Sequence, residues 1–264
     1  MNNRKRSYRS FRFNLEEFSG AFGDSITVIP LLIGVGITTE VSLGQLLLFF
    51  AAFQIATGLF YRLPMPVEPM KALASLTIAG ALTYQEALAG GFALGATLLA
   101  TGSLGLMKWL DEFVPESVVR GIQLGLGIIL VRTSVGYITD KLWLSAIGIG
   151  IVLVFIVLKN RYSVPDLSAF VVLILGIVYG VFVYGIPDIK IVQLPVFHFP
   201  NLADFPRGIV NGALPQFFLS VGNAVLATSL LFQDLLDREV DPDRLSQSMG
   251  FMCLASSLFG GFPA

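Results

Sequence analysis

The stretch LPMPVEPMKALA, residues 63–74, places three prolines and two opposite charges between strongly apolar segments. Glu68 and Lys71 are three residues apart, so on a helix they share a face and can form a structural ion pair. Alternatively, Lys71 belongs to an anion-binding site and Glu68 is a titratable carboxylate, because an anion beside Glu68 would favour its protonation. A third alternative leaves either side chain facing water. The residue types alone leave all three open.

A helix that begins near Pro66 would explain the prolines. Proline is tolerated in the first turn of a helix, because the N–H groups there have no intrahelical partner, and both Pro66 and Pro69 fit into one first turn. Helix amino ends attract anions through such free donors and through the macrodipole. The pattern therefore predicts an anion site at this helix start. The free N–H groups are expected around Val67, Glu68, Met70 and Lys71.

Asp24, in the apolar run SGAFGDSITVIPLLIGVG, is a second candidate for function. A carboxylate inside an apolar helix is costly unless it is paired or faces a water-filled cavity, so an intramembrane acid is a functional candidate by default. Ser25 and Thr27 add hydroxyl groups beside it. In the structural alternative, Asp24 bonds to a neighbouring helix at a close glycine contact. Glu68 and Asp24 are thus the two candidates for linking anion binding to proton uptake.

The composition is that of an integral membrane protein. Of the 264 residues, 55% are hydrophobic and only 13% are charged, with a mean hydropathy of +0.77, whereas soluble domains carry about 25% charged residues. The formal net charge of −1 gives no reason to expect a nucleic-acid partner. One cysteine (Cys253) and one histidine (His198) supply neither an intramolecular disulfide nor a metal site. With no nucleotide-binding loop or nucleophile–base pair in the sequence, neither an enzyme nor a cofactor is expected.

Apolar segments recur along the chain, most with the ~20 residues that a hydrocarbon core requires. They lie at about 15–37, 43–61, 66–80, 85–107, 117–136, 142–158, 167–185, 212–233 and 245–261. The segment at 66–80 is too short to cross alone. Its helix should begin inside the protein, where irregular backbone is tolerated only if it is buried or lines a cavity.

The distribution of basic residues predicts the orientation. With a cytoplasmic N-terminus, the cytoplasmic segments hold eleven Lys and Arg residues and the opposite side only three. Cytoplasmic loops of membrane proteins carry such an excess. We therefore expect a multi-pass protein of the cell inner (plasma) membrane with its N-terminus in the cytoplasm.

The two ends of the chain resemble each other. A shift of 199 residues places Gly23-Asp24 on Gly222-Asn223, and Leu59, Phe60 and Pro64 on Leu258, Phe259 and Pro263. Seven segments precede the second copy, so the copies would have opposite orientations, and inverted repeats with discontinuous helices are typical of secondary transporters. The expected divisions are a basic tail (1–14), a first repeat (15–185), a connecting loop (186–211) and the start of a second repeat (212–264).

Four stretches together, GAFGDSITVIP, LPMPVEPMKALA, VVRGIQLGLGIIL and LSVGNAVLATSLLFQDL, resemble the molybdate-transporter family of the sulfate permease superfamily. The resemblance runs from about residue 15 to the end, and the proline motif is its most specific part. It implies an all-α, uracil-permease-like fold of seven plus seven spans, in which the third and tenth segments are half-helices whose amino ends meet around the anion. It places at this site Pro66, Val67, Glu68, Pro69, Met70, Lys71, Asp24, Ser25, Thr27, Asn223 and Thr228.

The chain departs from this family pattern in two places. The family usually has Gln at the position of Glu68, so this chain adds an acid beside the expected anion. The family also continues beyond the final FPA with a Cys-His-Gly stretch that opens the tenth segment. The second repeat is therefore expected to be incomplete and the chain truncated.

These patterns predict a secondary active transporter of a tetrahedral oxyanion, molybdate or sulfate, that works by alternating access and is coupled to protons. Its expected partners are the anion, the proton and the lipid bilayer, and a homodimer is left open. One alternative is a nucleobase permease of the same fold, in which Glu68 would accept hydrogen bonds from ring N–H groups. The other is an anion channel or receptor on this scaffold.

Overall fold

The computed structural model describes residues 28–39, 41–113, 115–162, 167–185, 197–236 and 238–264, and these residues form helices without any strand. The chain divides into two compact units. One comprises the described residues between 31 and 131 and between 197 and 264; the other comprises the described residues between 132 and 185, with 28–30. The two units are described separately below.

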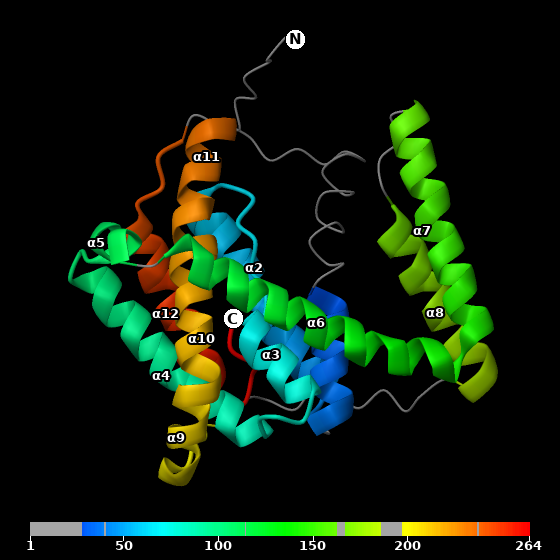
Figure 1. Ribbon diagram of the computed structural model, residues 1–264, viewed down its shortest axis with the longest axis horizontal. Helices are drawn as coiled ribbons and strands as arrows, with labels where there is room; N and C mark the ends of the chain where they lie inside the picture. The colour runs from blue at the N-terminus through cyan, green and yellow to red at the C-terminus, as the bar shows by residue number, and fades with distance from the viewer. Residues whose placement is uncertain (1–27, 40, 114, 163–166, 186–196, 237) are drawn as a thin grey trace. The chain divides into compact units, whose positions relative to one another are not determined.

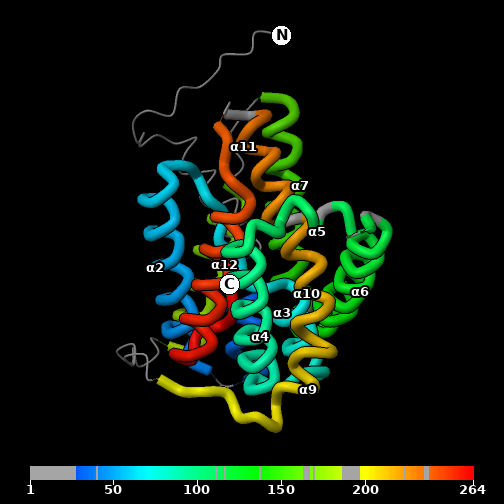
Figure 2. Tube along the Cα trace, turned by 90° about the vertical axis from the view of Figure 1, so that its left-hand side faces the viewer, coloured from blue at the N-terminus to red at the C-terminus, as the bar shows by residue number. Residues whose placement is uncertain are grey.

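The elements of the first unit follow the apolar segments of the sequence (Figure 1). After the helix Val28–Thr39 come α2 (Leu43–Tyr61), α3 (Lys71–Ile78), α4 (Tyr84–Ser103), α5 (Met107–Phe113) and the greater part of α6 (Glu116–Asp140). Later in the chain come α9 (Phe205–Arg207), α10 (Leu214–Leu219), α11 (Thr228–Leu236) and α12 (Pro242–Leu258). Two π-helical segments, η2 (Gly208–Ala213) and η3 (Ser220–Ala227), join α9, α10 and α11 into one continuous helical run (Figure 2).

Helices α4 and α12 pack side by side along their length, which brings residues about 150 positions apart into contact (Figures 1 and 2). Glycines permit the close approach: a Cβ atom on Gly250 would lie 2.5 Å from the backbone nitrogen of Leu99, and one on Gly95 would lie 2.9 Å from the carbonyl oxygen of Gly250. Small residues let helix backbones approach in this way in membrane proteins. The Ser246 hydroxyl donates to the Leu98 carbonyl at 2.8 Å and fixes the register of the pair.

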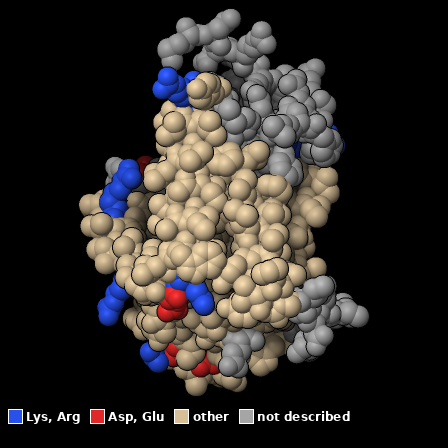
Figure 3. Space-filling model, turned by 90° about the vertical axis from the view of Figure 1, so that its right-hand side faces the viewer, with Lys and Arg blue, Asp and Glu red and all other residues tan. Residues whose placement is uncertain are grey.

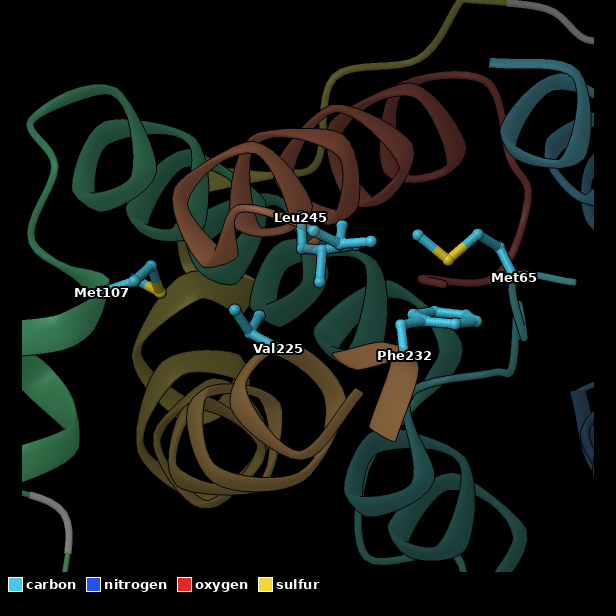
Figure 4. Close-up of a cluster of buried hydrophobic side chains, with 6 residues drawn as sticks. Met65, Met107, Val225, Phe232 and Leu245 are labelled. Atoms are coloured by element: carbon cyan, nitrogen blue, oxygen red, sulfur yellow. The ribbon is translucent and has the colours of Figure 1, made fainter. Parts of the chain in front are cut away.

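A buried hydrophobic cluster joins five elements of this unit (Figure 4). The side chains of Met65, Met107, Val225, Phe232 and Leu245 come from the stretch before α3 and from α5, η3, α11 and α12, and the Phe232 ring lies beside Met65. The cluster anchors the non-helical stretch between α2 and α3 from one side, because Met65 belongs to it.

The second unit contains α7 (Leu142–Tyr162) and α8 (Ser168–Tyr184), which pack against each other. Trp143 and Tyr179 meet edge to face, with their ring centroids 5.2 Å apart. Most of the large apolar side chains on these helices are exposed, as lipid-facing helices require. The face drawn in Figure 3 likewise shows mainly uncharged residues, with charged ones toward its lower part and its edges.

Four helical stretches in the described part of the chain are long and apolar enough to cross a membrane. They are Leu43–Tyr61, Ser117–Asp140, Leu142–Tyr162 and Leu202–Asp234. The predicted short segment at 66–80 is also present, as the eight-residue helix α3. Its predicted start at Pro66 is wrong, because α3 begins at Lys71.

The position of the α3 start has a steric cause. A proline disfavours the helical conformation of the residue before it, so Pro66 and Pro69 hold Met65 and Glu68 out of a helix. The chain can enter a helix only after Pro69, and Met70 becomes the N-cap, with φ −57° and ψ 102°. The missing N–H group of each proline permits a helix start at Pro66, but the restriction on the preceding residue prevents it.

Candidate functional site

The non-helical stretch from Pro64 to Met70 leads from α2 to α3 through the interior of the first unit. Arg62 ends α2 in the left-handed conformation (φ 52°), and its N–H donates to the Gly58 carbonyl. Val67 and Met70 are each only 3% exposed. Met65 and Pro69 are also buried, whereas Pro64 and Pro66 are exposed. The stretch is therefore irregular backbone that is only partly enclosed, and a membrane protein tolerates such backbone where it is enclosed by protein or lines a cavity.

Two of the backbone N–H groups at the start of α3 have partners from the far end of the chain. The Met70 N–H donates to the Pro263 carbonyl at 3.0 Å, and the Ala72 N–H donates to the side-chain oxygen of Gln216 at 2.7 Å. The prediction of a free Met70 N–H group is therefore wrong. The proline motif still delivers backbone donors to the interior, but distant segments of the same unit occupy two of them.

Glu68 and Lys71 form an ion pair, with 2.6 Å between Glu68 Oε2 and Lys71 Nζ. Their side chains are 27% and 50% exposed, respectively. Partly solvated pairs of this kind typically contribute no more than about 1 kcal/mol to stability. The fold therefore gains little stability from the pair.

A cavity of about 440 Å³ lies next to this motif, within the ~300–1,000 Å³ typical of small-molecule sites. The motif, residue Ala264 and segments of seven helical elements (α2, α3, α6, α10, η3, α11 and α12) form its wall. The polar or charged lining residues are Thr57, Tyr61, Glu68, Lys71, Gln123, Gln216, Thr228 and Ser248. The other lining residues are Met65, Pro66, Val67, Pro69, Met70, Leu126, Gly127, Leu130, Leu219, Ala224, Leu245, Met249, Met252 and Ala264.

The structure brings together most of the predicted site residues that it describes. All six motif residues, from Pro66 to Lys71, line the cavity, and so does Thr228 at the start of α11. Asn223 belongs to η3, but its side chain is not described. Asp24, Ser25 and Thr27 lie outside the described residues.

Gln216 is the main site residue that the sequence did not reveal. It lies on α10, lines the cavity and is 5% exposed. The available signal was a glutamine directly after Pro215 in an apolar span. Such a glutamine can be recognised as a buried polar group, but the sequence does not show which group it binds. Its partner, Ala72, is 144 residues away.

Tyr61 links α2 to α12 at the cavity wall. Its hydroxyl lies 2.6 Å from the Ser248 hydroxyl and donates to the Arg244 carbonyl at 3.1 Å. Among the residues that the structure describes, no group of three or more His, Cys, Asp or Glu side chains could hold a metal ion. The chemistry that this cavity offers is therefore binding through one cation, hydroxyl and amide groups and a carboxylate.

Comparison with known proteins places this arrangement in a family. A family model described as "Molybdate transporter of MFS superfamily" matches residues 16–130 and 208–264. The chain belongs to this molybdate transporter family. The matched ranges include the proline motif, Gln216 and the final residues that meet Met70, so the cavity is built almost entirely from the family's own segments.

Curated relatives agree with this assignment. The chain is 30% identical to Molybdate transporter 2 of Arabidopsis thaliana in an alignment 299 residues long. The alignment covers 94% of this chain and 64% of the relative. It is also 30% identical to Molybdate transporter 1 of the same plant, covering 96% of this chain and 66% of the relative. The chain thus spans about two thirds of the length of these proteins, which are named as transporters and not as enzymes.

A solved structure shows the fold. The transmembrane domain of a cyanobacterium bicarbonate transporter, BicA, matches with a TM-score of 0.60 at 18% sequence identity. The match covers 96% of this family member and 74% of the BicA chain. The described helices therefore adopt the fold of a membrane transport domain.

Proposed function

We propose that this chain acts in the secondary transport of a tetrahedral oxyanion, molybdate or sulfate, by alternating access. The cavity beside the proline motif is the observation that carries the proposal. It combines the Lys71 ammonium group, the amino end of a half-helix, the hydroxyl of Thr228 and the amide of Gln123. Cations, hydroxyls and helix amino ends are the groups that bind oxyanions.

Lys71 is the principal anion ligand in this proposal. An incoming dianion competes with Glu68 for Lys71, because both bear negative charge. A carboxylate that loses its cation and gains an anionic neighbour is favoured to take up a proton. Anion binding and proton uptake would then be linked at Glu68. Asp24 remains the second predicted coupling residue.

The inverted repeat is part of the proposal and has structural support. Under the 199-residue shift, the first residue of α2, Leu43, falls on the first residue of α12, Pro242. The non-helical stretches that follow these two helices meet through the hydrogen bond from Met70 to Pro263. This is the arrangement expected when two discontinuous segments approach each other at a midplane site. Membership of the sulfate permease superfamily is implied by the motif resemblance and stays a prediction, with which the BicA-like fold is compatible.

The expected setting is the inner (plasma) membrane, with a cytoplasmic N-terminus. Four spanning-length helices support a membrane location, and the excess of basic residues supports the orientation. A homodimer remains a prediction, and cross-linking in membranes tests it. Accessibility labelling of a cysteine placed at Lys159, at the end of α7, from each side of the membrane tests the orientation.

Binding and uptake measurements test the function. Purified protein in nanodiscs should bind molybdate or sulfate, and vesicles that contain it should accumulate the anion when a proton gradient is applied. Uracil and xanthine should not compete. Inhibition by uracil or xanthine, without inhibition by molybdate or sulfate, would contradict the proposal.

Glu68 favours a nucleobase permease as the second candidate function. A carboxylate at the cavity wall can accept hydrogen bonds from the ring N–H groups of a base. The competition experiment separates the two candidates directly. A channel or receptor would bind the anion but would not accumulate it against a gradient.

A further inference from the structure

Gln216 makes a hydrogen-bond chain that ties α10 to the start of α3. Its Oε1 atom accepts from the Ala72 N–H at 2.7 Å, and its Nε2 atom donates to the Ser220 hydroxyl at 3.2 Å. The orientation of the amide is fixed, because a backbone N–H can only donate and must face the oxygen. The Ser220 hydroxyl in turn lies 3.7 Å from the Met70 sulfur, to which it donates. Both amide ends and the hydroxyl are thereby engaged.

The hydrogen bond from Gln216 caps the amino end of α3, which has no capping side chain of its own. The N-cap residue of α3 is Met70, whose side chain makes no capping hydrogen bond, and the N–H groups in a first helical turn need partners from outside the helix. Gln216 provides one from another helix, at a position where it is 5% exposed. It therefore fixes the first turn of α3, which carries Lys71, relative to the cavity wall.

We propose that Gln216 is a positioning residue for anion binding: it holds the amino end of α3 so that Lys71 faces the cavity. This inference rests on the proposed function. The neutral amide also matters, since Gln216 lines the same cavity as Glu68 and Lys71. A carboxylate of the same shape could still accept from Ala72 but would repel the anion. Gln216 thus accepts a hydrogen bond from the first turn of α3 and, because it is neutral, does not repel the anion.

Two substitutions and a matched control test this inference by molybdate binding and thermal unfolding in nanodiscs. Gln216→Leu removes both hydrogen bonds and is expected to raise the Kd at least tenfold. Gln247→Leu is the control, because Gln247 joins α12 to α4 by a 2.9 Å hydrogen bond to the Gly102 carbonyl, away from the cavity lining. Gln247→Leu should lower the melting temperature by a similar amount and leave the Kd within twofold of the unsubstituted protein.

Gln216→Glu gives a readout that a purely structural role would not change. The protonated acid has the donor and acceptor of glutamine, so the Kd should approach the unsubstituted value at acidic pH. It should rise at least tenfold as the carboxyl ionises. The other titratable groups lining the cavity are Glu68, Lys71 and Tyr61, and the pH profile of the unsubstituted protein accounts for their contribution. This variant also keeps the Ala72 cap and remains informative if Gln216→Leu does not fold.

The outcomes separate this inference from the proposed function. An unchanged Kd for Gln216→Leu with a lowered melting temperature, or a pH-independent difference for Gln216→Glu, would make Gln216 a structural residue only. If the unsubstituted protein binds uracil or xanthine in place of molybdate and sulfate, the oxyanion function fails. The affinity ratios for that ligand then decide the role of Gln216. Binding of none of these ligands would overturn both.

Discussion

Replacing Lys71 by alanine is expected to weaken molybdate binding by at least about 30-fold. Lys71 is the only Lys or Arg residue among those that line the cavity in the described part of the chain. Its ammonium group pairs with Glu68 at 2.6 Å. The substitution removes the attraction for a dianion and also leaves Glu68 without this cation, so both effects act against anion binding.

The magnitude follows from charge and exposure. Two unit charges about 4 Å apart attract by about 1 kcal/mol in water and by about 4 kcal/mol at an effective dielectric constant of 20. A dianion doubles these values. The Lys71 side chain is 50% exposed, so the value for water is the appropriate lower bound. About 2 kcal/mol corresponds to about a 30-fold change in Kd.

Equilibrium titration of molybdate into protein in nanodiscs measures this change. Lys71→Arg keeps the charge and should retain affinity within several-fold. Lys159→Ala removes an exposed cation from the end of α7 and should leave the Kd unchanged. Because salt screens exposed charges over about 10 Å at 0.1 M, the effect of Lys71→Ala should shrink at high salt. A Kd within threefold of the unsubstituted protein for Lys71→Ala would reduce Lys71 to a structural partner of Glu68.

Four further substitutions test other parts of the structure. Glu68→Gln should tighten molybdate binding by about tenfold, since it removes the competitor for the cation, and should weaken the pH dependence of uptake; an unchanged pH dependence would contradict a coupling role for Glu68. Gly250→Ala should lower the melting temperature, because its Cβ would meet the α4 backbone at 2.5 Å and overpacking costs about 1–3 kcal/mol. Gly148→Ala on α7, where nothing lies within 4 Å, should leave it unchanged or raise it slightly. Tyr61→Phe should cost about 1 kcal/mol in unfolding free energy through lost hydrogen bonds to α12, and an unchanged melting temperature would show that this link does not stabilise the fold.

The lengths of the apolar segments predicted the helices well. The segment expected at 43–61 has the bounds of α2, and the one expected at 142–158 differs from α7 only at its end. Apolar length suffices for such spans, because each helix satisfies its own backbone hydrogen bonds. It could not reveal the π-helical segments η2 and η3, because an apolar run does not distinguish i→i+5 from i→i+4 hydrogen bonding.

The proline motif was predictable in kind but not in detail. A short helix after an irregular stretch follows from three prolines in an apolar setting, and the spacing of Glu68 and Lys71 predicted that they can pair. The start of α3 at Lys71 required the steric restriction that Pro69 places on Glu68. The occupied N–H groups could not be predicted, because their acceptors, on Gln216 and Pro263, are more than 140 residues away in sequence.

The same prolines explain why segments that are distant in the sequence build the cavity together. They keep residues 64–70 out of a helix, so the backbone there must find partners elsewhere in the interior. Met70 and Ala72 find them on two separate later segments, at Pro263 and Gln216. Any movement of α10 or of the final stretch therefore changes the support of the turn that carries Lys71. If alternating access moves these segments relative to α3, the two hydrogen bonds are the first contacts to change, and anion affinity would change with them. Cysteine pairs that cross-link α10 to α3 should then hold the protein in one affinity state, whereas unchanged transport after cross-linking would show that the two segments move together.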